Sequence, residues 1–95
     1  MKWFKCFIAG ENFPGELIQE NKLIGFYTTR FVNASTREEA EIIALNNLKK
    51  EEKLQLPEGV VPSDQARVFF EQIDEVNSSD IPEIEVGFTF YVMYT

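Results

Sequence analysis

The chain of 95 residues contains no histidine and only one cysteine, Cys6. Histidine is the commonest general base in enzymes and the commonest metal ligand, so Ser–His and Cys–His catalytic arrangements are excluded. One cysteine can form neither an intrachain disulfide nor a zinc site. The glycines match neither a dinucleotide-binding nor a P-loop pattern. We therefore expect a protein that is not an enzyme and that has no catalytic residues, bound metal or cofactor.

The sequence also lacks a long apolar run and an excess of basic residues. No stretch approaches the roughly 18 apolar residues of a membrane span. The formal net charge of -7, from 16 acidic and 9 basic residues, disfavours nucleic acid and anionic membranes as partners. The acidic surface serves solubility or binds a basic protein. A lone cysteine suits a reducing compartment and the apolar start ends at Ala9, so we expect a cytoplasmic location.

What the chain does contain is short blocks of aromatic and β-branched residues. They predict strands over residues 3–9, 23–33, 66–76 and 87–95. The residues FPGE at 13–16 predict a type II turn with a positive φ at Gly15. Ser35 predicts the N-cap of a helix over residues 36–50, in a capping box with Glu38. At helical spacing, one apolar face of that helix is formed by Ala40, Ile43, Ala44 and Leu48.

This order of elements predicts a single α+β domain over residues 1–95. Its architecture is a two-layer sandwich, with one helix on one face of a four-stranded, mainly antiparallel sheet. A right-handed crossover through the helix places the first strand between the second and the third. We expect the fourth strand beside the third, which gives the sheet order 2-1-3-4. The connection over residues 77–86 is long for a hairpin.

One helix covers one face of such a sheet, yet the strands carry apolar residues on both faces. Alternation along the first strand sets Phe4, Cys6 and Ile8 against Trp3, Lys5 and Phe7. In the third strand it sets Val68 and Phe70 against Phe69 and Ile73, and in the fourth it sets Phe88 and Phe90 against Tyr91. Two covers are possible for the second face: loop 54–65 together with residues 17–18, or a second copy of the chain. We favour the second copy, in a homodimer.

The second face is therefore the expected functional surface, with Trp3, Phe7, Arg30 and Tyr91 on it. Arg30 stands there if Tyr27 and Phe31 face the helix. In that position it forms an ordinary cross-strand ion pair with a residue such as Glu71. Alternatively, its guanidinium group among aromatic rings holds an anionic ligand or a carboxylate of a partner.

The segment GFYTTRFVNASTREEAEIIAL, with FPG before it and ARVFFEQIDEV after it, resembles a family of small uncharacterised bacterial proteins. Members have a GFYTTR-type strand followed by a helix start of S-x-x-E-A type, which reads STREEA here. The resemblance covers most of the chain and implies no activity. More loosely, the strand-to-helix joint is similar to that of HicB-like antitoxins.

From the residues themselves we predict a non-catalytic protein-interaction module that self-associates through the aromatic sheet face. One alternative is an acidic antitoxin or immunity-type protein that binds a basic partner. The other is a binder of a small anionic ligand around Arg30.

Overall fold

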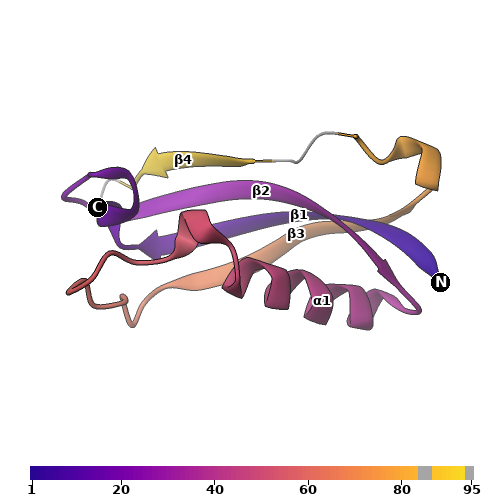
Figure 1. The fold of residues 1–95 in the computed structure, drawn as a ribbon, viewed down its shortest axis with the longest axis horizontal. Coiled ribbons are helices and arrows are strands. Elements are labelled where there is room, and N and C mark those ends of the chain that lie inside the picture. Colours follow the sequence, from indigo (N-terminus) through magenta and orange to yellow (C-terminus); the bar gives the residue numbers. More distant parts are fainter. Residues whose placement is uncertain (84–86, 94–95) are drawn as a thin grey trace.

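The computed structural model describes residues 1–83 and 87–93, in which a helix packs on one face of a four-stranded sheet (Figure 1). The strands are β1 (Lys2–Phe13), β2 (Ile24–Ala34), β3 (Arg67–Val76) and β4 (Phe88–Val92), and the helix is α1 (Arg37–Lys49). Short 3-10 turns lie in the connections: η1 (Gly15–Ile18), η2 (Glu52–Leu54) and η3 (Ser78–Asp80). The predicted α+β class is confirmed. The end of the predicted fourth strand, 94–95, lies outside the described residues.

The strands are ordered β3-β1-β2-β4, and every neighbouring pair is antiparallel. The predicted position of β1 between β2 and β3 is correct, but the predicted position of β4 beside β3 is wrong. β4 pairs with β2 because Phe88 and Phe90 pack edge-to-face on Phe26, at ring-centroid distances of 5.3 and 6.2 Å. The long connection after β3 carries the chain from one edge of the sheet to the other (Figure 1).

The β1–β2 connection differs from the predicted type II turn. Pro14 has the φ of -61° and ψ of 129° that such a turn requires, but Gly15 starts η1 and does not adopt a positive φ. Glycine is needed at this position for space, since a Cβ there would overlap the backbone oxygen of Lys22. β1 also runs beyond its predicted end at Ala9, to Phe13.

The helix is capped by Thr36 and not by Ser35 as predicted. The Thr36 hydroxyl accepts a hydrogen bond from the backbone N–H of Glu39 at 3.1 Å. The Glu39 carboxylate accepts one from the backbone N–H of Ser35 at 3.2 Å. Thr36 takes this role because its backbone is still extended, with φ -136° and ψ 164°, immediately before the first helical residue. The predicted capping box is therefore displaced by one residue.

The core lies between α1 and the sheet, and the predicted apolar face of the helix is confirmed. Its buried residues are Phe4, Cys6, Ile8, Val32, Ala34, Ala40, Ala44, Leu48 and Ile73, with Ile43 packed half-buried against them. Ile73 is in this core, although strict alternation predicts the other face. The register of β3 against β1 shifts between Phe7 and Ile8, which leaves Glu71 as an extra residue in β3 and changes the phase of the strand.

No helix in the described part of the chain is long and apolar enough to cross a membrane.

Candidate functional site

The face of the sheet away from α1 is called the open face. Directly opposite residues in an antiparallel sheet point to the same side, so the strand register assigns its members. They are Trp3, Lys5, Phe7, Ala9 and Glu11 of β1; Gly25, Tyr27, Thr29, Phe31 and Asn33 of β2; Arg67, Phe69, Gln72, Asp74 and Val76 of β3; and Thr89 and Tyr91 of β4. Of the four predicted site residues, Trp3, Phe7 and Tyr91 lie on this face and Arg30 does not.

A row of three parallel rings, the aromatic stack, lies across the middle of the open face. The Tyr27 ring centroid is 5.5 Å from that of Phe7 and 5.5 Å from that of Tyr91, with interplanar angles of 8° and 25°. Phe7 is on β1 and Tyr91 is on β4, on opposite sides of β2. Both ring faces of Tyr27 are therefore occupied, and its edge is presented to solvent. Phe7 is 38% exposed and Tyr27 is 40% exposed.

Gly25 allows this stack to form, because Tyr91 lies directly over it. A Cβ at position 25 would overlap the Tyr91 ring, so a glycine lets the ring approach the sheet. Burial raises the pKa of Tyr91, and the neighbouring Tyr27 and the charges of Glu11 and Glu71 raise it further. The phenol therefore stays neutral at physiological pH and keeps its hydroxyl hydrogen as a donor.

Charges of both signs lie around the aromatic stack. Lys5 is directly opposite Asp74, and Glu11 is directly opposite Arg67. With Glu71, whose charge acts on Tyr91, the open face carries two basic and three acidic residues, a net charge of -1. The other described residues carry seven basic and twelve acidic residues, a net charge of -5. Per residue, the net charge of the open face is therefore close to that of the rest of the described chain, but four of its five charges stand in two facing pairs of opposite sign.

Loop 54–65 lies on the helix side, so the alternative in which it covers the open face is wrong. Leu54, Leu56 and Val60 line a pocket together with residues of α1. The start of the loop is held there by Gln55, whose side-chain amide donates to the backbone oxygen of Lys49 at 3.0 Å. The other suggested cover, residues 17–18, belongs to η1 in the β1–β2 connection, at one end of the sheet (Figure 1).

Arg30 is on the helix side of the sheet, opposite Cys6 in the register. It pairs with Glu51, just after α1, with 3.3 Å between Nη2 and Oε2, and not with Glu71 as predicted. Its guanidinium carbon also lies 5.0 Å from the centroid of the Phe88 ring. The Arg30 and Glu51 side chains are only 14% and 17% exposed. This pair ties the end of the helix to the sheet, and it leaves no free guanidinium group for an anionic ligand.

The thiol of Cys6 is not available as a nucleophile. Cys6 is fully buried, and burial, reinforced by the charge of Glu41, raises the pKa of its thiol to about 11. The thiolate, which is the nucleophilic form, is therefore almost absent near neutral pH. Within residues 1–83 and 87–93, no group of three or more potential ligands could hold a metal ion.

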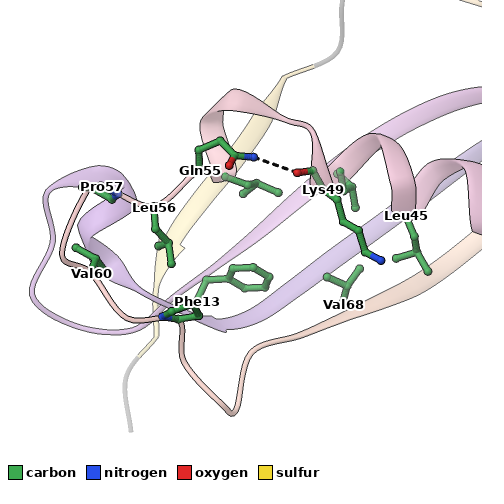
Figure 2. Close-up of a pocket in the computed structure, with 11 residues that line it drawn as sticks. Phe13, Leu45, Lys49, Gln55, Leu56, Pro57, Val60 and Val68 are labelled. Atoms are coloured by element: carbon green, nitrogen blue, oxygen red, sulfur yellow. Dashed lines mark hydrogen bonds between the residues drawn. The ribbon is translucent and has the colours of Figure 1, made fainter.

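The pocket lined by loop 54–65 lies on the helix side of the sheet, at the end of α1. Figure 2 shows it between the helix, loop 54–62 and the ends of β1 and β3. Its volume is about 580 Å³, and its lining is mainly apolar. It is separate from the open face, because its strand residue Val68 lies opposite Gly10 on the core side of the sheet.

Reasoning from the sequence missed Tyr27 as the centre of the aromatic stack and did not anticipate the pocket. A signal for Tyr27 was present in the alternation of β2. The residues at 24, 26, 28, 32 and 34 are apolar or small apart from one threonine, whereas the intervening set includes Thr29 and Asn33. That pattern places Tyr27 and Phe31 on the open face and Arg30 on the core side. The pocket depends on how a loop folds back, which has no such local signal.

Comparison of the chain with protein-family models, with curated proteins and with solved structures gives no significant match.

Proposed function

We propose that the chain is a non-catalytic protein-interaction module that pairs with a second copy of itself through the open face. The observation that carries the proposal is the aromatic stack, which is partly exposed at the middle of a sheet face that neither the helix nor loop 54–65 covers. Exposed apolar surface of this kind is costly in water and usually marks an interface. Aromatic residues are also enriched at the centres of such interfaces.

The size of the open face fits a stable dimer. Strands about 4.8 Å apart that rise about 3.3 Å per residue give the 12, 11, 10 and 5 residues of β1, β2, β3 and β4 a flat footprint of about 600 Å². Side chains make the accessible area larger than this footprint. A standard interface buries about 800 Å² on each partner, so the face supplies roughly the area required.

The charge distribution favours a second copy as the occupant. The open face carries two basic and three acidic residues, and Lys5 faces Asp74 while Arg67 faces Glu11, so both signs of charge lie close together on it. In a two-fold dimer the same patch meets itself. Lys5 and Arg67 of one copy can then approach Asp74 and Glu11 of the other, which makes the face self-complementary.

The geometry of the rings disfavours a planar ligand. A sugar or a nucleobase binds to an aromatic side chain by stacking on a free ring face. Tyr27 has a neighbouring ring at each of its faces. At the centre of the open face, only the edge of its ring is therefore available to a binding partner. Ring edges pack well against the side chains of a second sheet, and packed sheets lie about 10 Å apart with interdigitated side chains.

The proposal places this module in a reducing compartment such as the bacterial cytoplasm, which is the setting that a single unpaired cysteine suits. A basic protein partner for the acidic surface remains the second hypothesis. The anion-binding hypothesis loses its basis, because Arg30 is paired with Glu51 on the core side.

The experiment is sedimentation equilibrium at micromolar concentration on the native chain and on two matched variants. Tyr27→Glu places a charge at the centre of the open face, and Ile42→Glu places one on the outer surface of α1, where Ile42 is 59% exposed. We expect dimers for the native chain and for Ile42→Glu, and folded monomers for Tyr27→Glu, because an unpaired charge is costly to bury. A native chain that sediments as a monomer, or dimers of equal strength in all three proteins, would overturn the proposal.

A further inference from the structure

The pocket at the end of α1 has the volume and the lining of a ligand site. Its volume of about 580 Å³ lies within the usual range of roughly 300–1,000 Å³ for small-molecule sites. Nine of its eleven lining residues are apolar, and the other two are Lys49 and Gln55. Ligand sites commonly combine such an apolar wall with a small number of polar groups.

The walls of the pocket are held by specific contacts. Phe13 packs edge-to-face on the buried Phe26, with ring centroids 5.0 Å apart. The Gln55 amide is bound to the backbone oxygens of Lys49 and Glu51 at 3.0 and 3.2 Å. Within the loop itself, the backbone N–H of Val60 donates to the backbone oxygen of Pro57 at 3.1 Å. The loop is therefore held in place as one wall of the pocket, and its prolines restrict its movement into the pocket.

The lining has one charged group, the ammonium of Lys49, which Figure 2 shows extending toward Leu45 and Val68. Among the described residues, Lys49 forms no ion pair. The amide of Gln55 is already used at the helix end. The pocket thus offers an extended apolar surface with a single cation beside it.

We propose that this pocket binds a linear amphiphile, an unbranched alkyl chain that ends in a carboxylate, with the carboxylate paired to Lys49. A bound peptide needs partners for both its backbone N–H and its C=O groups, but beyond the occupied Gln55 the lining side chains supply only the donors of the Lys49 ammonium and no acceptor. An alkyl chain needs none. If each non-hydrogen atom with its hydrogens takes about 30 Å³, a ligand that fills three-quarters or all of the pocket has roughly 14 to 19 non-hydrogen atoms.

The test is a titration with sodium decanoate, followed by the NMR shifts of leucine and valine methyl groups. We expect saturable shifts at the methyl groups of Leu45, Leu56, Val60 and Val68, and none at the open-face residue Val76. Homologous carboxylates should bind up to about fourfold more tightly per added methylene until the pocket is filled. Decyltrimethylammonium, with the same chain and the opposite charge, should bind more weakly.

Two pairs of variants separate the parts of the site. Val60→Glu removes the apolar lining, whereas Val61→Glu changes its 80% exposed neighbour, and only the first should abolish binding. Lys49→Gln should weaken decanoate binding about three- to fivefold, and Lys50→Gln should not, because only Lys49 lines the pocket. Thermal melts check that each variant is folded.

The proposal fails if decanoate causes no saturable shifts, or if the shifts lie on the open face. It also fails if Lys49→Gln and Lys50→Gln weaken binding equally, or if decyltrimethylammonium binds as tightly as decanoate. None of these results bears on self-association, which uses the opposite face of the sheet.

Discussion

The ion pair between Arg30 and Glu51 gives the sharpest prediction about stability. Glu51→Gln leaves the Arg30 guanidinium group largely buried without its counter-charge, while its Nε already has no hydrogen-bond partner. Breaking a fully buried pair costs about 3–5 kcal/mol. Here the two side chains keep 14% and 17% exposure, and the Phe88 ring still faces the cation. We therefore expect a loss of about 1.5–3 kcal/mol, the range of one hydrogen bond to a charged group.

The assay is urea denaturation at one fixed protein concentration, because the proposed self-association would make apparent stability depend on concentration. The control is Glu52→Gln at the adjacent exposed residue, which should change the free energy of unfolding by less than about 0.5 kcal/mol. Replacing both partners, with Arg30→Met and Glu51→Leu, should recover most of the loss, because no buried charge then remains. If Glu51→Gln costs no more than Glu52→Gln, the pair is solvated and the reasoning is wrong.

Further predictions concern the cap, the core and the thiol. Thr36→Ala should cost about 1 kcal/mol and Ser35→Ala much less; equal losses in urea denaturation would contradict the assignment of the cap to Thr36. Leu48→Ala, in the buried core, should cost about 2–5 kcal/mol, and a loss below 1 kcal/mol in the same assay would show that the helix packs on another face. The folded thiol of Cys6 has a pKa of about 11 against 9.0 when unperturbed, so the unfolded chain loses its proton first and stability should fall between pH 9 and 11. The difference from Cys6→Ala over that range should reach roughly 1–3 kcal/mol, and identical pH profiles would refute it.

The sequence predicts those features of the fold that depend on local pattern. The α+β class, the apolar face of α1 and the two faces of β1 follow from periodicity over a few residues. The position of β4 does not, because either sheet edge could have accepted it, and the choice depends on Phe88 and Phe90 meeting Phe26, more than sixty residues earlier in the chain.

The candidate site was predictable in part for the same reason. Trp3, Phe7 and Tyr91 were placed on the correct face, since alternation holds through β1 and β4. The prediction for Arg30 is wrong because it required Tyr27 and Phe31 to face the helix, whereas both lie on the open face. On the core side, Glu51 at the end of α1 supplies the counter-charge of Arg30. Loop packing and the bulge at Glu71 are tertiary features, so the pocket and the burial of Ile73 had no local signal.

One NMR measurement tests directly where two copies of the chain touch. A sample that mixes isotope-labelled and unlabelled protein gives nuclear Overhauser effects between copies in a filtered NMR experiment. The proposed dimer predicts such effects from the rings of Phe7, Tyr27 and Tyr91 to the other copy, and none from Ile42 on the outer surface of α1. An absence of intermolecular effects at concentrations that fill a micromolar dimer, or effects that come from Ile42 and the helix, would contradict the account.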